Sequence, residues 1–143
     1  MSIKEHITSI YVTDQDRAKA FYIDTLGFEL IADRGLNSGF RTVLIRSPGE
    51  PAHQIALFAA NAKGIGVDED MAAQMRSLIE KSAFSAGILR VADCYAYSAE
   101  LTAKGVRFIL EPGPRDFGAV ESIILDDSGN RLAIMSPIEE GSS

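Results

Sequence analysis

Two stretches of the chain carry the same features in the same order, and this repeat limits the possible folds more than any other property of the sequence. The first runs from Ile10 to Leu30, IYVTDQDRAKAFYIDTLGFEL, and the second from Ile88 to Leu110, ILRVADCYAYSAELTAKGVRFIL. Each begins with strand-forming residues, passes through an aspartate into a segment with helical spacing, and resumes an extended pattern after a glycine. Each copy therefore predicts a strand, a capped helix and a second strand.

The two helical segments are bounded in the same way. Asp14 and Asp93 stand at N-cap positions, where a carboxylate accepts hydrogen bonds from free N–H groups of the first turn. Gly27 and Gly105 stand where each helix should end, and glycine is favoured there because it adopts left-handed backbone angles. Mostly apolar side chains fall on one helix face: Ala18, Phe21, Tyr22, Thr25 and Leu26 in the first copy, and Cys94, Tyr97 and Leu101 in the second. Cys94 is accordingly predicted to be a small core residue.

The match continues beyond the helices. An apolar strand and a turn with glycine follow in each copy, VLIRSPGE and IILDDSGN, and a short strand closes each, QIALFA and RLAIMS. Asp14 and Gly49 are 35 positions apart, and Asp93 and Gly129 are 36 apart. The sequence thus predicts an α+β fold made of two βαβββ repeats, at about residues 1–63 and 84–140, within one domain of residues 1–143.

The segment between the repeats predicts an amphipathic connecting helix at about residues 68–81. Met71, Met75, Leu78 and Ile79 share one helical face, and Asp68 to Asp70 place negative charge at the N-terminus, where the helix dipole favours it. We expect this face to pack on the body of the protein or on a partner subunit. A stripe that contains methionine can also line an adaptable binding surface, and this alternative stays open.

Composition excludes several classes of function. The formal net charge of −6, with no cluster of Lys and Arg, argues against a nucleic-acid partner. One cysteine cannot form an internal disulfide, a Cys-based zinc site or an iron–sulfur cluster. No apolar run approaches the roughly 20 residues of a membrane span, and MSIKEHITS lacks the apolar core of a signal peptide. We expect a cytoplasmic protein that is not associated with a membrane.

With these residues in view, the chain resembles the vicinal oxygen chelate superfamily, which includes glyoxalase I, bleomycin-resistance proteins and extradiol dioxygenases. The resemblance rests on YVTDQDRAKAFYIDTLGFEL, VADCYAYSAELTAKGVRF and the late FGAVESIILDDSGNRLAIM. It implies two βαβββ modules whose sheets curl into a glyoxalase-like cup, with helices outside and the ligand site in the cup. It also implies a homodimer, in which each cup comes from one chain or from modules of both. The superfamily hosts many chemistries, so the resemblance implies the fold more strongly than the activity.

The same resemblance implies where metal ligands would stand. Metal-dependent members hold a divalent ion with a His or Gln seven residues before each capping Asp and a Glu in the last strand of each module. The corresponding positions here are Ile7, Ala86, Ala56 and Ala133. None of these side chains has a lone pair for a metal, so we expect no metal cofactor.

The two histidines do not replace these ligands. His6 neighbours a ligand position, but a shift of one residue turns a side chain to the opposite face of a sheet, so only a bulge would bring it to the site. His53 lies in the loop GEPAHQ, where a histidine bonded to the loop or to solvent is expected.

The cup would then bind its ligand by shape and hydrogen bonding. Strand alternation predicts that Ser9, Tyr11, Phe58, Ile88, Arg90 and Met135 point into the cup. Phe117 lies in the loop at the cup mouth. The predicted ligand-binding residues are Ser9, Tyr11, Phe58, Arg90, Phe117 and Met135. Arg90 can pair with a carboxylate or phosphate of the ligand, or with an inward Glu121 or Glu111. Phe117 covers the ligand or fills the rim, and Phe40 and Arg41 hold the corresponding place in the first copy.

Three functions are compatible with this pattern. The favoured one is a metal-free small-molecule binding protein of the bleomycin-resistance type, with no cofactor. The second is a metal-dependent lyase, isomerase or dioxygenase whose ligands lie elsewhere. The third is a metal-free enzyme that transfers protons through Tyr11, Arg90 or an inward Glu.

Overall fold

The computed structural model describes residues 2–138, and the chain divides into two compact units between Lys81 and Ser82. Each unit is described by itself. The expected limits of the domain at residues 1 and 143, and of the second repeat at residue 140, lie outside the described residues. Within the described range, no helix has the length and apolar character needed to cross a membrane.

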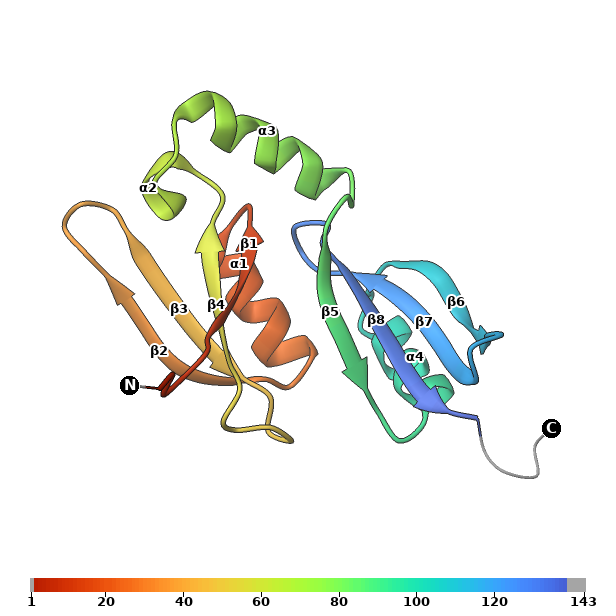
Figure 1. Cartoon of the computed structure of the whole chain (residues 1–143). Helices are drawn as coiled ribbons and strands as arrows, with labels where there is room; N and C mark the ends of the chain where they lie inside the picture. Colours follow the sequence, from red (N-terminus) through yellow and green to blue (C-terminus); the bar gives the residue numbers. More distant parts are fainter. Residues whose placement is uncertain (1, 139–143) are drawn as a thin grey trace. The chain divides into compact units, whose positions relative to one another are not determined.

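The first unit is a four-stranded mixed sheet with helices (Figure 1). Its strand order is β1-β4-β3-β2; β1 runs parallel to β4, and the other neighbours are antiparallel. Its elements are β1 (Thr8–Val12), α1 (Gln15–Ala20), the π-helix η1 (Phe21–Thr25), β2 (Glu29–Gly35), β3 (Arg41–Arg46), β4 (Gln54–Ala59), α2 (Ala62–Ile65) and α3 (Glu69–Glu80).

The second unit repeats this topology. Its sheet has the order β5-β8-β7-β6, with β5 parallel to β8 and the other neighbours antiparallel. Its elements are β5 (Ser85–Arg90), α4 (Cys94–Ala103), β6 (Phe108–Pro114), β7 (Ala119–Leu125) and β8 (Arg131–Pro137). The predicted α+β class, with two modules of a strand, a helix and three strands, is confirmed. Each sheet is open and does not close on itself.

The predicted helix boundaries are confirmed at both copies. The Asp14 side chain accepts a hydrogen bond from the Arg17 N–H at 3.0 Å, and the Asp93 side chain accepts one from the Ala96 N–H at 3.1 Å. Gly27 and Gly105 follow the helices with φ of +84° and +82°. These angles lie in the left-handed region, where a side chain would be strained, so glycine is needed to end each helix and start the next strand.

The first helix differs from the prediction in one respect. After Ala20 it continues as a π-helix, in which the Leu26 N–H donates to the Phe21 carbonyl at 3.1 Å. Tyr22 within this wider turn is fully buried, and its ring meets those of Phe21 and Phe28 edge to face. The apolar spacing of the sequence does not distinguish one such turn from a regular α-helix, so the sequence did not indicate it.

Each core lies between one sheet face and the helix of the same unit. Figure 1 shows α1 against one face of the first sheet and α4 against one face of the second. Most buried strand residues alternate along the strands: Ile10, Val12, Val43, Ile45 and Leu57 in the first unit, and Val120, Ile124, Leu132 and Ile134 in the second. Ala56 and Leu125 are exceptions, because each is buried next to another buried residue. Full burial of one such side chain contributes about 1.5–3 kcal/mol. Alternation therefore leaves the intervening side chains on the faces opposite α1 and α4.

Cys94 belongs to the second of these cores, as predicted. It is fully buried, with its Sγ 3.4 Å from the Ile134 carbonyl oxygen and 3.6 Å from the Ser122 Oγ. The Cys94 N–H also donates to the Ser136 Oγ at 2.9 Å. These contacts attach the start of α4 to the strands β7 and β8.

The connecting helix α3 buries a narrower face than its apolar pattern suggests. Ala72 and Ile79 are fully buried, and the Arg76 guanidinium donates to the Ala60 carbonyl at 2.9 Å. Met71 and Leu78, on the neighbouring face, stay exposed. The expected packing on the body of the protein therefore uses only part of the stripe.

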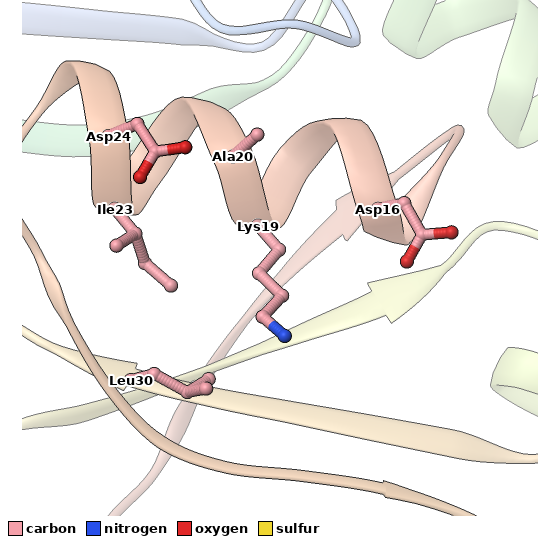
Figure 2. Close-up of a pocket in the computed structure, with 6 residues that line it drawn as sticks. All are labelled: Asp16, Lys19, Ala20, Ile23, Asp24 and Leu30. Atoms are coloured by element: carbon pink, nitrogen blue, oxygen red, sulfur yellow. The ribbon is translucent and has the colours of Figure 1, made fainter.

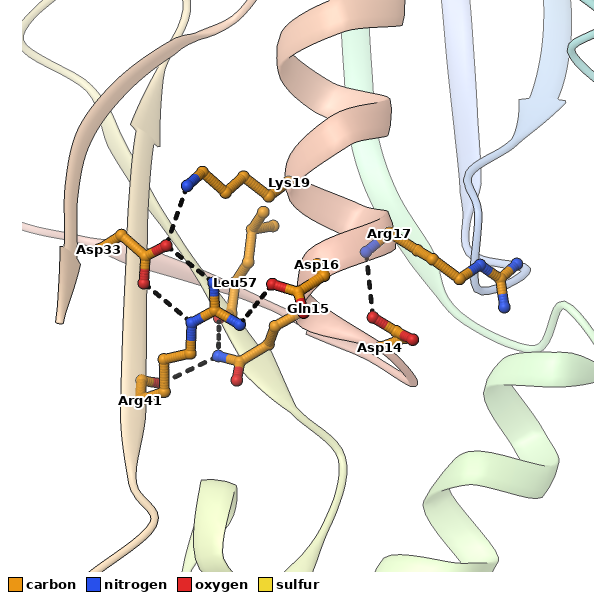
Figure 3. A network of polar contacts seen from close by, with 8 residues as sticks. All are labelled: Asp14, Gln15, Asp16, Arg17, Lys19, Asp33, Arg41 and Leu57. Carbon is orange, nitrogen blue, oxygen red and sulfur yellow. Dashed lines mark hydrogen bonds and ion pairs between the residues drawn. The ribbon is translucent and has the colours of Figure 1, made fainter. Parts of the chain in front are cut away.

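A network of charged side chains ties α1 to β2 and β3 (Figure 3). Arg41 donates two hydrogen bonds to the Asp33 carboxylate, at 2.8 and 2.7 Å, and a third to Asp16 at 2.8 Å. The Lys19 ammonium lies 3.0 Å from the same Asp33 carboxylate. The hydrogen bonds from Arg41 and Lys19 hold the pKa of Asp33 well below its usual range, and those to Asp33 and Asp16 raise the pKa of Arg41.

Substitution of Asp33 by Asn tests the contribution of this network. Because the pKa of Asp33 is lower in the folded than in the unfolded chain, its stabilisation is present at neutral pH and is lost as the pH falls. We expect Asp33→Asn to lower the free energy of unfolding at pH 7 by about 1 kcal/mol, since the pair is partly exposed to solvent. The difference from the wild type should shrink as the pH falls from about 5 to about 2.

Urea unfolding followed by circular dichroism at several pH values measures this difference. Asp116→Asn, at an exposed position in the β6–β7 turn, is the control and should leave stability unchanged at every pH. An equal loss for Asp33→Asn at pH 7 and pH 2.5 would contradict the assigned origin of the effect.

The turn between β7 and β8 depends on one buried carboxylate. Asp126 is 1% exposed, and its Oδ1 accepts hydrogen bonds from the N–H groups of Ser128, Gly129 and Asn130 at 2.9, 3.0 and 2.9 Å. Its Oδ2 accepts a further bond from the Asn130 side chain at 3.1 Å. This residue opens the DDSGN motif of the sequence and organises the backbone of the whole turn.

Asp126→Ala should lower the free energy of unfolding by about 3 kcal/mol, because three backbone donors would lose their partner in a buried turn. Asp126→Asn keeps one acceptor oxygen and should fall between Asp126→Ala and the wild type. Asp116→Ala makes the same change at an exposed site and serves as the control in the same urea titration. Equal unfolding midpoints for Asp126→Ala and its control would show that the turn does not need the carboxylate.

Candidate functional site

The predicted ligand-binding residues of the first unit lie on the sheet face opposite α1. Ser9 and Tyr11 alternate along β1 with the buried Ile10 and Val12. The parallel ladder pairs Tyr11 with Phe58 of β4. Laterally paired residues share a face, so Ser9, Tyr11 and Phe58 all point away from α1.

This face presents an aromatic surface. The Tyr11 side chain is 40% exposed although it is large and largely apolar, and Phe58 beside it is partly buried. The Phe40 ring lies 5.8 Å from that of Phe58, which adds a third aromatic residue. Arg41, predicted to accompany Phe40, instead lies on the α1 side in the network with Asp33, because adjacent strand residues point to opposite faces.

The face opposite α4 carries the predicted residues of β5 and β8. Arg90 pairs with Met135 in the parallel ladder, and Met135 pairs with Glu121 of β7. Ile88 lies two residues before Arg90 on the same face and is 59% exposed. One basic, one acidic and two apolar side chains therefore lie close together on this face.

Glu121 pairs with a different arginine from the one considered in the sequence. Its carboxylate Oε1 lies 3.6 Å from Arg115 Nε, and its side chain is only 13% exposed. Arg115 also donates to the backbone carbonyls of Glu121 and Glu111 at 2.9 and 2.8 Å. Arg115 belongs to the turn that joins β6 to β7, so it reaches Glu121 within one hairpin.

The alternative in which Arg90 pairs with Glu121 or Glu111 is therefore wrong for this unit. Among the described residues, neither carboxylate forms an ion pair with Arg90, and Arg90 is exposed. The Arg115 guanidinium compensates the charge of Glu121. Arg90 thus presents a positive charge on a face that also carries the apolar side chains of Ile88 and Met135.

Phe117 lies in the β6–β7 turn and is 57% exposed. The turn is closed by a hydrogen bond from the Arg115 N–H to the Ala119 carbonyl at 2.8 Å, and Gly118 has φ of +86°. The turn is therefore ordered by its own backbone. Whether Phe117 covers a ligand or only fills the rim stays a prediction.

The four positions that correspond to metal ligands do not fit a metal ion. Ile7 immediately precedes β1, and Ala56 lies within β4. Ala86 lies where the register between β5 and β8 shifts, and Ala133 pairs with Ile88. None offers a donor atom, and the described residues include no group of three or more His, Cys, Asp or Glu side chains placed to hold an ion. The side chains at these four positions therefore cannot coordinate a metal ion.

The two histidines lie outside the strands of the first sheet, just before β1 and just before β4. His6 is exposed and precedes β1, so no bulge of that strand carries it to the sheet face. The His53 Nε2 lies 3.1 Å from the Thr8 Oγ1, and its Nδ1 lies 3.9 Å from Glu50. Both contacts place His53 in the exposed loop before β4, as the sequence predicts.

A recess that the sequence did not indicate lies on the α1 side of the first unit (Figure 2). Its volume is about 340 Å³, and its lining residues are Asp16, Lys19, Ala20, Ile23, Asp24 and Leu30. None of the six predicted ligand-binding residues lines it. No sequence pattern marks this recess, because five of its residues have the spacing of ordinary surface positions on a helix and the sixth is a single strand position.

The chain is similar to known proteins over almost its whole length. Residues 5–134 match the family model of the Glyoxalase/Bleomycin resistance protein/Dioxygenase superfamily. The uncharacterised protein YurT of Bacillus subtilis (strain 168) is 31% identical over 130 residues, which cover 90% of this chain and 95% of YurT.

Solved structures show the same likeness. The crystal structure of UcmS2 has a TM-score of 0.84 and 33% identity, and the match covers 94% of this chain and 98% of that one. TnmS3, an antibiotic binding protein from Streptomyces sp. CB03234, has a TM-score of 0.68 and 25% identity, with 96% and 99% covered. The similarity thus extends over both units of the chain.

Proposed function

The chain belongs to the Glyoxalase/Bleomycin resistance protein/Dioxygenase superfamily, and we propose that it is a metal-free small-molecule binding protein of the bleomycin-resistance type. The similarity to TnmS3, an antibiotic binding protein, supports a binding role. The apolar side chains at the four metal-ligand positions support a role that does not use the metal of the superfamily's enzymes.

One observation carries the proposal. Arg90 is exposed on the face opposite α4, beside Met135 and the exposed Ile88, while Glu121 is compensated by Arg115. A mostly apolar surface with a few placed polar groups is typical of small-molecule sites. An amphipathic ligand with an anionic group fits this combination, because it can bury its apolar part and satisfy the guanidinium.

Arginine suits this task better than lysine would. Its planar guanidinium presents two parallel N–H donors to a carboxylate or phosphate, which fixes the orientation of the anion as well as attracting it. Glu121 would repel an anion if it were unpaired. Its pairing with Arg115 removes most of that repulsion from the neighbourhood of Arg90.

Ser9, Tyr11 and Phe58 are proposed as ligand contacts on the first unit, and Phe117 is proposed as a further contact on the second unit. Tyr11 and Phe58 would contribute aromatic area, and Ser9 a hydroxyl group. A homodimer and a cytoplasmic location stay predictions, as does the absence of a nucleic-acid partner.

The role of Arg90 can be tested with 8-anilinonaphthalene-1-sulfonate, a fluorescent amphipathic anion. Arg90→Ala should weaken its binding about 10-fold, because a charge-assisted contact is lost. Arg90→Lys should weaken it less, since a point charge remains without the forked geometry. Fluorescence titration of the full chain gives the dissociation constants, and circular dichroism checks that each variant is folded.

Arg107→Ala is the matched control, because Arg107 is an exposed arginine of the same unit. It should leave probe binding unchanged. Equal affinities for Arg90→Ala and the wild type, or equal losses for Arg90→Ala and Arg107→Ala, would show that Arg90 does not recognise the anion.

The predicted homodimer has a direct test. Sedimentation equilibrium of the full chain at micromolar concentration should give twice the chain mass. A single species of monomer mass at the highest concentration reached would show that the prediction is wrong.

A further inference from the structure

The recess beside α1 lies on the opposite side of the first sheet from Tyr11 and Phe58. The helix contributes Asp16, Lys19 and Ala20 from α1, and Ile23 and Asp24 from η1; β2 contributes Leu30. In Figure 2 the side chains of Lys19 and Ile23 point from the helix toward the strand that carries Leu30. The volume of about 340 Å³ falls within the range of small-molecule pockets, which is roughly 300–1,000 Å³.

The floor of the recess is apolar and incompletely covered. Leu30 pairs with the fully buried Ile45, which places Leu30 on the α1 side of the sheet, yet Leu30 is 43% exposed. The ladder between β2 and β3 shifts register after Leu30, and the helix above changes to a π-turn at Phe21–Thr25. Single π-turns occur frequently at functional sites. Together with Ala20 and Ile23, Leu30 offers apolar area to a ligand of modest size.

The side chains at and beside the recess carry more negative than positive charges. Lys19 is engaged by Asp33, and Arg41 is shared between Asp33 and Asp16. Asp24 forms no ion pair with any residue that the structure describes, and it is exposed at the edge of the recess. Three carboxylates against two cations leave one negative charge, and the uncompensated carboxylate is that of Asp24.

From this geometry we propose that the recess is a second binding site, which takes an amphipathic organic cation with a single positive charge. The cationic group lies at Asp24, and the apolar body covers Ala20, Ile23 and Leu30. A cation balances the surplus charge, whereas an anion would meet Asp24 and Asp16 without a free basic partner, because Lys19 is held by Asp33. The site has the opposite charge preference from Arg90 and does not depend on the function proposed above.

Titration of the isotopically labelled full chain with benzyltrimethylammonium, followed by two-dimensional amide NMR, tests the proposal. Saturable shifts should gather at residues 16–30, with a dissociation constant on the order of 1 mM for so small a probe. Benzyl alcohol and benzoate, which carry the same ring without the positive charge, should bind at least 5-fold more weakly.

Two variants separate the polar and apolar parts of the site. Asp24→Asn should weaken binding of benzyltrimethylammonium about 5-fold, and Leu30→Ser should weaken the cation and benzyl alcohol alike. Both residues are exposed, so native amide spectra are expected; if either variant fails to fold, the other decides the outcome. Asp116→Asn is the control for loss of one exposed carboxylate and should bind like the wild type.

Three results would overturn the proposal. They are shifts spread over the surface rather than gathered at the recess, equal binding of benzoate and benzyltrimethylammonium, and unchanged affinity in both Asp24→Asn and Leu30→Ser. None of these bears on Arg90, so the two sites fail or succeed independently.

Discussion

The alternation of side chains along a strand, combined with one helix packed on each sheet, is the constraint on which both units depend. A side chain on a strand points either toward the helix or away from it. Ile10, Val12 and Leu57 point toward α1, as Ile124 and Ile134 point toward α4, and their burial stabilises each unit. Most of the residues between them, Ala56 excepted, are not buried in these cores. Their chemistry can therefore vary with less effect on the fold, and the proposed ligand contacts on the strands lie among them.

Ion pairs between neighbouring side chains then decide which charged groups are available to bind a ligand. Arg41 and Lys19 are engaged by Asp33 and so fasten α1 to the sheet rather than bind anything outside it. Arg115 engages Glu121 in the same way in the second unit. Arg90 and Asp24 are two of the exposed charged residues that form no ion pair with any described residue, and each lies beside exposed apolar side chains. These two groups carry opposite charge on different units, and each proposal follows from the group that its neighbours leave unmatched.

The sequence predicted the features that depend on local backbone chemistry. Asp14 and Asp93 cap their helices, and Gly27 and Gly105 end them, because these roles need only a side-chain oxygen or a left-handed φ. Strand parity also placed Tyr11 and Arg90 correctly relative to the buried residues of β1 and the α4 core. Side-chain pairing is harder to predict from the sequence: Glu121 pairs with Arg115 of the adjoining turn and not with Arg90, which precedes it on another strand. The recess leaves no periodic signal in the sequence, because its lining combines surface positions of α1 and η1 with the exposed Leu30 of β2.

Loss of the metal ligands is compatible with retention of the fold for the same reason. Ala133 is flanked along β8 by Leu132 and Ile134, both buried against α4, while Ala133 itself points to the opposite face. Exchange of a carboxylate for a methyl group at such a position removes a ligand and leaves the core untouched. Ala56 pairs with Ser9 on the face opposite α1 but is itself only 2% exposed, so a larger side chain there would also need space within the unit. A fold that keeps most of its core on one face of each sheet can therefore change the chemistry of the other face through a few substitutions.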